Sequence, residues 1–147
     1  MTDELIVVAD DDALDEINDF ISEHLEEVEC DAKKRFQLEL AVEEIVVNIV
    51  SYAYEGGEAP EDSGEDPFWG KIRVALELTE DPAVLTLSFM DQGSFFDPLA
   101  AEEADTSGKM FMERVGGFGI LMVKETMDDV SYVYRDGTNI LTIKKNL

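Results

Sequence analysis

The sequence predicts an α+β fold, with helices on one face of a mixed, largely antiparallel sheet. Two observations support this fold class. Apolar residues recur at helical spacing in some stretches and alternate with polar residues in others. These stretches run in the order strand, two helices, two strands, a polar segment, a helix and two strands. With 147 residues, 45% of them hydrophobic, the chain is expected to form a single domain over residues 1–147.

The chain begins with a predicted strand followed by a predicted helix. Leu5–Ala9 is a short apolar run rich in β-branched residues, as strands commonly are. Asp10–Asp12 follow it and are expected to cap a helix over Ala13–Val28. These acids do not form an EF-hand, which needs alternating ligands, a central glycine and a terminal glutamate. The helix is expected to bury one stripe, made of Leu14, Ile17, Phe20, Ile21 and Leu25.

The central helix is predicted over Phe36–Tyr54, with Asp31 as its expected cap. Its apolar side chains share one broad arc: Leu38, Ala41, Val42, Ile45, Val46, Ile49, Tyr52 and Ala53. Glu44 and Asn48 lie one turn apart at the edge of this arc, so they should project together where the core meets a cleft. An acid and an amide placed there are typical of a site. The alternative is structural: Asn48 could form a hydrogen bond with a neighbouring backbone group while Glu44 faces water, and the sequence pattern would be the same.

The middle of the chain combines loops with a predicted hairpin. Glu55–Gly70 is rich in glycine, proline and acids and is expected to be an exposed loop. Lys71–Thr79 and Ala83–Met90 alternate apolar and polar residues, which predicts two paired strands around the turn Asp81-Pro82. The polar stretch Leu99–Val115 is expected to form a short helix and a lid.

The last part of the chain predicts one helix and a second pair of strands. The helix is entered through a glycine-rich turn and carries Ile120, Leu121, Val123, Lys124 and Met127. Val130–Tyr134 and Ile140–Ile143 are expected to be strands on either side of the turn Arg135–Thr138.

The charge of the chain excludes several classes of partner. Thirty-five acids against eleven bases give a formal net charge of −24. Such a charge repels nucleic acid and anionic membrane surfaces, so neither is expected as a direct partner. An acidic surface favours basic protein partners through electrostatic complementarity.

Few residues are available for metal or redox chemistry. Cys30 is the only cysteine and His24 the only histidine, which excludes an intrachain disulfide, a zinc cluster and a redox pair and argues against a histidine-based mechanism. No apolar run is long enough to cross a bilayer, and the first residues lack the basic flank and apolar core of a secretory signal. We therefore expect a cytoplasmic protein.

Two further motifs could carry chemistry. Gly116, Gly117 and Gly119 open a helix, where free backbone N–H groups and the helix dipole can hold phosphates. Glycine before a helix also serves chain geometry alone, so the alternative stays open. Asp91 ends a strand and is followed by Gly93, which places a carboxylate at the lip of the core. A carboxylate could accept a hydrogen bond from an adenine amino group, although an ordinary turn explains the same residues.

Taken in order, three motifs resemble those of a known superfamily. They are Glu44-x-x-x-Asn48, Asp91-x-Gly93-x-x-Phe96-Asp97-Pro98 and Gly116-Gly117-Phe118-Gly119-Ile120. They resemble the nucleotide-binding motifs of the GHKL, or histidine kinase-like, ATPases, which include gyrase, heat-shock chaperones, histidine kinases and mismatch-repair proteins. Within this superfamily, EEIVVNIVSYAY, FFDP and GGFGILMVKETMDDVSY resemble bacterial anti-sigma factor serine/threonine kinases. The resemblance covers nearly the whole chain and implies a two-layer α/β sandwich of the Bergerat type.

The resemblance implies roles for the catalytic and metal-binding residues. Asn48 would be the side-chain ligand of a Mg²⁺ ion that bridges the phosphates of ATP. Glu44 would be the general base that deprotonates the attacking hydroxyl. Arg114 and Lys109 are the only cations of the expected lid, and Arg114 is the stronger candidate for countering phosphate charge.

It also implies how the nucleotide would be held. Asp91 would accept a hydrogen bond from the adenine amino group, and Gly93 would leave room for the ring. Gly117 and Gly119 would close the loop over the phosphates, and Gly116 would belong to the same nucleotide-binding turn.

The resemblance further implies partners and a regulatory role. The chain would bind a sigma factor and phosphorylate an anti-anti-sigma protein of the STAS type, and a homodimer is consistent with the family. The alternative is a non-catalytic nucleotide-binding module that regulates a protein partner and does not need Glu44. An acidic structural protein without a nucleotide site would require all three motifs to be coincidental.

Overall fold

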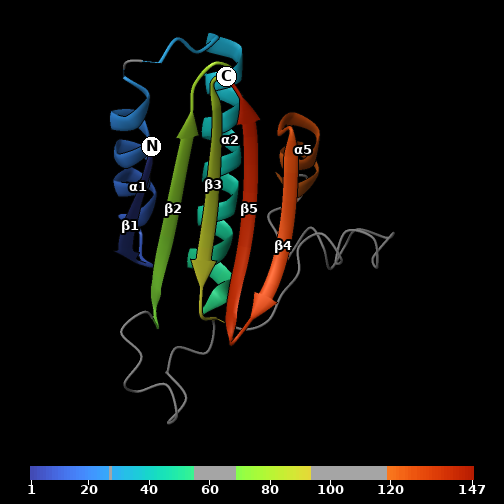
Figure 1. The fold of residues 1–147 in the computed structure, drawn as a ribbon. Coiled ribbons are helices and arrows are strands. Elements are labelled where there is room, and N and C mark those ends of the chain that lie inside the picture. Colours follow the sequence, from blue (N-terminus) through green and yellow to red (C-terminus); the bar gives the residue numbers. More distant parts are fainter. Residues whose placement is uncertain (27, 55–68, 94–118) are drawn as a thin grey trace.

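The computed structural model describes residues 1–26, 28–54, 69–93 and 119–147. Five strands form one sheet, and the helices pack on one of its faces (Figure 1). The strands are β1 (Thr2–Val8), β2 (Lys71–Thr79), β3 (Val84–Asp91), β4 (Asp129–Arg135) and β5 (Thr138–Asn146). The helices are α1 (Ala13–Leu25), α2 (Ala32–Asn48), the π-helix η1 (Ile49–Ala53) and α5 (Gly119–Thr126). The predicted α+β class is confirmed.

The sheet has the strand order β1-β2-β3-β5-β4, and all four pairings between the described strands are antiparallel. The predicted hairpin of β2 and β3 is present, with Thr79 opposite Val84 at the turn. Alternate residues of both strands are buried against the helices, as the alternation of their sequence predicts. The core therefore lies between the helical layer and one face of the sheet, while the described residues leave the other face uncovered.

Both predicted aspartate caps were wrong in detail. Asp12 occupies the N-cap position of α1 but makes no side-chain capping bond. Its backbone has helical angles, φ −89° and ψ −10°, whereas a capping side chain needs an extended backbone. Asp10 instead accepts a hydrogen bond from the Asp12 N–H at 2.9 Å, which forms a local turn. Asp31 at the start of α2 also makes no side-chain cap.

Helix α2 begins at Ala32, earlier than Phe36, where the predicted helix begins. Its first turn, Ala32 to Arg35, consists of strong helix formers that carry no apolar period, so periodicity could not detect it. The helix then continues as the π-helix η1 up to Ala53. Short π-helices are rare and often lie at functional sites.

Strands β4 and β5 are joined by the two-residue turn Asp136-Gly137. Both residues have positive φ angles, 52° and 76°, as hairpin turns of type I′ require. The turn pairs Arg135 with Thr138 and thereby sets which residues of β4 lie opposite β5.

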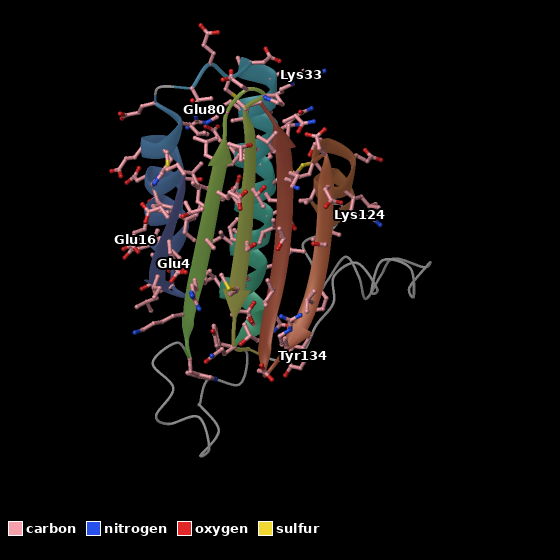
Figure 2. All side chains as sticks on the ribbon, viewed as in Figure 1. Glu4, Glu16, Lys33, Glu80, Lys124 and Tyr134 are labelled. Carbon is pink, nitrogen blue, oxygen red and sulfur yellow. The ribbon has the colours of Figure 1, made fainter. Side chains whose placement is uncertain are left out.

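Most charged side chains of the described residues lie on the outside of this fold, whereas Asp91 and Lys145 are buried. Figure 2 shows Glu16, Lys33, Glu80 and Lys124 at its periphery. No helix within the described ranges is long and apolar enough to cross a membrane.

Candidate functional site

The candidate site lies at one end of the sheet, where β3 ends, β5 begins and α2 passes into η1 (Figure 1). Antiparallel pairing places Asp91, the last residue of β3, directly opposite Asn139 on β5. The same register places Asp91 opposite Ile72 on β2. Residues far apart in the sequence are therefore neighbours at this end of the sheet.

Asp91 is held in a hydrogen-bond network that crosses three strands. Its side chain is nearly buried, at 7% exposure. Asn139 Nδ2 and the Gly93 N–H both donate to Asp91 Oδ1, each at 3.0 Å. The Tyr132 hydroxyl of β4 donates to Asn139 Oδ1, so both ends of the Asn139 amide are engaged. This network fixes the orientation of the Asp91 carboxylate, as buried and satisfied polar networks do.

Burial changes the acidity of this carboxyl. Removal from water raises the pKa of Asp91 above its ordinary value, and the hydrogen bonds from Asn139 and Gly93 offset part of this rise. The ionised carboxylate is therefore less favourable in the folded chain than in the unfolded one. A buried acid of this kind, at the end of a strand, is typical of a functional site.

Asp91→Asn is accordingly expected to gain stability relative to wild type as the pH rises. The pKa of Asp91 is higher in the folded chain than in the unfolded chain, so protonation of Asp91 stabilises the fold. This stabilisation is fully present below about pH 4 and is lost as the pH rises through the pKa of the folded chain. Asparagine does not titrate, so it avoids this loss. Urea unfolding of both proteins between about pH 4 and pH 7 measures the difference. A difference that stays constant with pH, or the same trend in the exposed control Asp129→Asn, would contradict the argument.

Gly93 is required where the end of β3 meets the π-helix. A Cβ on Gly93 would lie 1.9 Å from the carbonyl oxygen of Ala53 and 2.7 Å from its Cβ. These distances are shorter than any non-bonded contact, so only glycine allows this approach of the two backbones. The position that a side chain would take is filled by Ala53. The sequence-based role of Gly93, room for an adenine ring, stays a prediction.

Tyr54, the residue after the π-helix, forms a second link to the end of the sheet. Its hydroxyl donates to the Lys71 carbonyl at 2.7 Å and accepts from the Gln92 N–H at 2.9 Å. Burial raises the pKa of Tyr54 to about 12, with a smaller contribution from the charge of Asp91. The phenol therefore remains protonated near neutral pH and can donate to Lys71. Its ring lies edge-on to Trp69, with 5.0 Å between the ring centroids.

Glu44 and Asn48 are adjacent on the last turns of α2, as their spacing predicts. Asn48 Nδ2 lies 3.4 Å from Glu44 Oε1 and donates to it. This contact turns the amide NH₂ toward Glu44, and none of the described residues donates a hydrogen bond to Asn48 Oδ1. Burial raises the pKa of Glu44, the Asn48 hydrogen bond lowers it, and the nearby charge of Glu43 raises it.

Most of the site residues predicted for the lid belong to a part of the chain that the structure does not describe. Lys109, Arg114, Gly116 and Gly117 lie outside the described residues, as does most of the acidic loop before β2. Gly119 is the first residue of α5, and this helix packs against α2. The structure therefore places α5, whose start follows the lid, beside the helix that carries Glu44 and Asn48.

Three residues of the site were not predicted: Asn139, Tyr132 and Tyr54. A signal existed for Asn139, because alternation in β5 assigns it to the buried face together with Leu141 and Ile143. A polar residue at such a position requires a partner. The partner itself could not be identified without the pairing of β3 with β5.

The sequence is similar to a family of ATPase domains and to named protein kinases. The family model described as the histidine kinase-like ATPase domain matches residues 7–145. The chain is 29% identical over 112 residues to the serine/threonine-protein kinase BtrW of Bordetella bronchiseptica, covering 76% of this chain and 70% of BtrW. It is 29% identical over 111 residues to the serine-protein kinase RsbW of Listeria monocytogenes, covering 73% of this chain. That match spans 63% of the RsbW protein, less than two thirds of its length.

Solved structures share the fold. The RsbU and RsbW domains of Rv1364c from Mycobacterium tuberculosis align with a TM-score of 0.62 and 19% identity, over 100% of this chain and 32% of that chain. The SiaB–SiaC complex from Pseudomonas aeruginosa aligns with a TM-score of 0.55 and 14% identity, over 98% and 89% of the two chains. At these identities the likeness concerns the fold alone.

Proposed function

The chain belongs to the histidine kinase-like ATPase domain family, and from this membership we propose that it is a Mg-ATP-dependent protein serine/threonine kinase. The observation that carries the proposal is the Asp91 carboxylate, fixed by Asn139 and Gly93 at the end of the sheet where Glu44 and Asn48 also lie. The names of the similar proteins BtrW and RsbW support protein phosphorylation as the reaction.

Asp91 is proposed to recognise adenine. Within the described part of the chain, both hydrogen bonds to Asp91 end on Oδ1. Oδ2 is thus proposed to accept a hydrogen bond from the adenine amino group. Asn139 acts through Asp91 in this proposal, because its amide determines which oxygen faces the ligand.

Asn48 fits a magnesium ion by the chemistry of its donor atom. Its Nδ2 is turned toward Glu44, which leaves the amide oxygen as a hard ligand of the kind Mg²⁺ prefers. Mg²⁺ in such sites keeps several waters and takes few protein ligands beside the phosphates. Gly116, Gly117 and Gly119 are proposed to hold the phosphates through backbone N–H groups, and Arg114 to counter their charge.

Glu44 is proposed to be the general base. Bound Mg-ATP would supply the phosphoryl group and the charge compensation that its transfer requires. Glu44 would accept the proton of a serine or threonine hydroxyl, and the hydrogen bond from Asn48 would hold its carboxylate in place. The raised pKa of Glu44 makes it a stronger base than a fully solvated glutamate.

The proposed biological role is that of an anti-sigma regulatory factor in transcription regulation. The chain would sequester a sigma factor and phosphorylate an anti-anti-sigma protein of the STAS type, with homodimer formation as part of the same proposal. The sequence motifs and the kinase names of its relatives support this role. A non-catalytic nucleotide-binding module is the second candidate, and it would bind ATP without needing Glu44.

Nucleotide selectivity of Asp91→Asn tests the proposed adenine contact. Asn139 and Gly93 both donate to Oδ1, so the new amide should place its oxygen there and turn its NH₂ toward the base. Two donors would then face each other, and ATP binding is expected to weaken by about 10- to 100-fold, as one unsatisfied buried group costs about 1–3 kcal/mol. Guanine carries a carbonyl oxygen at this position, which can accept a hydrogen bond from the new amide. The affinity for GTP should therefore fall less than the affinity for ATP, or rise.

Titration calorimetry with ATP and GTP measures both affinities. Asp129→Asn, at an exposed position on β4, provides the matched control. An equal loss for both nucleotides in a folded Asp91→Asn protein would show that Asp91 does not contact the base.

A further inference from the structure

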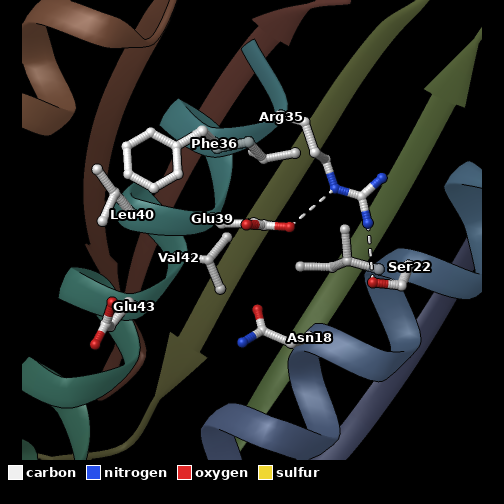
Figure 3. A pocket seen from close by; sticks show the side chains of 10 residues that line it. Asn18, Ser22, Arg35, Phe36, Glu39, Leu40, Val42 and Glu43 are labelled. Carbon is white, nitrogen blue, oxygen red and sulfur yellow. Dashed lines mark hydrogen bonds and ion pairs between the residues drawn. The ribbon is translucent and has the colours of Figure 1, made fainter. Parts of the chain in front are cut away.

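A groove runs between α1 and the first half of α2 on the helical layer (Figure 3). Its volume is about 350 Å³, which lies within the range of binding pockets. Its floor is apolar and buried, and its walls are polar. The lining residues are Asn18, Ile21, Ser22, Arg35, Phe36, Leu38, Glu39, Leu40, Val42 and Glu43.

An exposed aromatic side chain stands at the edge of this groove. Phe36 has 59% of its surface exposed, although it lies on a helix whose other face forms the core. Figure 3 shows Phe36 and Leu40 next to each other along α2. Val47, 44% exposed, continues the same side of the helix at helical spacing. An apolar stripe of this kind is a common feature of surfaces that bind another protein.

The groove is acidic as well as apolar. Glu39 and Glu43 lie on its α2 side, and the exposed Asp15 and Asp19 lie on α1 next to Asn18. Arg35 is the only basic residue among those that line it, and it is engaged within the groove. Its guanidinium donates to Ser22 Oγ at 2.9 Å and lies 3.4 Å from Glu39 Oε1. The local charge therefore has the same sign as the net charge of −24.

We propose that this groove docks a basic amphipathic helix of a protein partner. Apolar side chains of that helix would enter the groove above Val42 and pack against Phe36, and its lysine or arginine residues would face Glu39 and Glu43. Helices with an apolar face commonly bind in grooves of this type, and opposite charges favour the encounter. A second copy of the chain would bring another acidic surface against Glu39 and Glu43, so it fits this groove less well than a basic helix does. The proposed homodimer would then use a different surface.

The proposal goes beyond kinase activity, because it concerns a surface and a class of partner. Phe36 precedes Asn48 by twelve residues of helix, or about 18 Å along its axis. Glu43, at the other end of the groove, is only five residues or about 7.5 Å from Asn48 along the axis, but five residues turn the helix by about 140°, so these two side chains project from different sides of α2. Docking would therefore leave the positions of Asp91 and Asn48 accessible. A chain that transfers no phosphate would still bind through this groove, so failure of the kinase proposal and failure of the docking proposal are distinguishable.

A designed peptide of about 18 residues tests the docking surface, with leucine on one helical face and lysine on the other. Its fluorescein-labelled form is titrated with the full chain, and anisotropy reports binding. Phe36→Ser and the charge reversal Glu43→Lys are each expected to weaken binding by at least about tenfold, since central apolar and charged anchors dominate such interfaces. Chemical shift changes in the labelled wild-type chain should centre on residues 18–22 and 35–43.

Matched controls separate this groove from general attraction between opposite charges. Val133→Ser removes an exposed apolar residue, 43% exposed, from the uncovered face of the sheet, and Glu80→Lys reverses an exposed acid at the β2–β3 turn (Figure 2). Both are expected to bind the peptide as wild type does. An equal loss in the controls would overturn the proposal. It would also be overturned if wild type sedimented as a dimer and Phe36→Ser as a monomer, because the groove would then belong to a second copy.

Discussion

Glu44→Gln is expected to lower the rate of phosphoryl transfer to a serine or threonine by about 10²- to 10⁴-fold. Glutamine has nearly the same shape and can still accept the hydrogen bond from Asn48, so the end of α2 should remain intact. It cannot accept a proton from the substrate hydroxyl. The loss should therefore appear in kcat, with ATP affinity almost unchanged, since the removed interaction belongs to the transition state. Initial rates with a STAS-type substrate, together with calorimetry for Mg-ATP, measure both quantities.

Glu16→Gln is the matched control for this variant, because Glu16 is an exposed glutamate on the outer side of α1 (Figure 2). It should phosphorylate the substrate at the wild-type rate. Full activity in Glu44→Gln would show that Glu44 is not the base. If no active wild type can be obtained with any substrate while Mg-ATP still binds, the non-catalytic module becomes the better assignment.

Mg-ATP is expected to raise the thermal midpoint of wild type by about 5–10 °C, and this shift should largely disappear in Asn48→Ala. A ligand at about 100 times its dissociation constant stabilises the folded state by about 2.7 kcal/mol, which accounts for a shift of this size in a domain of this length. Asn48→Ala removes the amide oxygen proposed to bind Mg²⁺. Thermal unfolding with Mg-ATP, Mg-ADP and ATP plus a chelator measures the effect.

Asn146→Ala provides the control, because Asn146 is an exposed asparagine at the opposite end of β5 from Asn139. It should retain the full shift with Mg-ATP. No shift in wild type would refute nucleotide binding at this site. An unchanged shift in Asn48→Ala would be consistent with nucleotide binding but would exclude Asn48 as the magnesium ligand.

Much of the fold follows from local patterns in the sequence. Alternation predicted that Ile72, Val74, Leu76 and Leu78 of β2 point inward, and all four are buried, because one face of the strand packs against helices. The spacing of Glu44 and Asn48 predicted their contact, because residues four apart on a helix are neighbours. Element ends were less predictable. The first turn of α2 and the capping of α1 depend on backbone angles that no apolar pattern records.

The support of Asp91 could not be predicted from local patterns. Asn139 and Tyr132 reach it only because β5 lies between β3 and β4 in the sheet, and strand order is a property of the whole chain. The groove beside Phe36 could not be predicted for a related reason. Periodicity places Phe36 outside the apolar arc of its helix, but only the position of α1 beside α2 shows that Phe36 borders a groove.

The turn Asp136-Gly137 has a consequence for how sequence variants of this protein would be interpreted. Among the described strands β4 lies at the edge of the sheet and pairs with β5 alone, so a residue inserted in this turn would move β4 and leave β5 in place. A shift of one residue would carry Tyr132 to the uncovered face of the sheet and remove its hydrogen bond to Asn139. An insertion in a surface turn would then impair the binding site as a mutation of a site residue does, although no residue next to Asp91 had been changed.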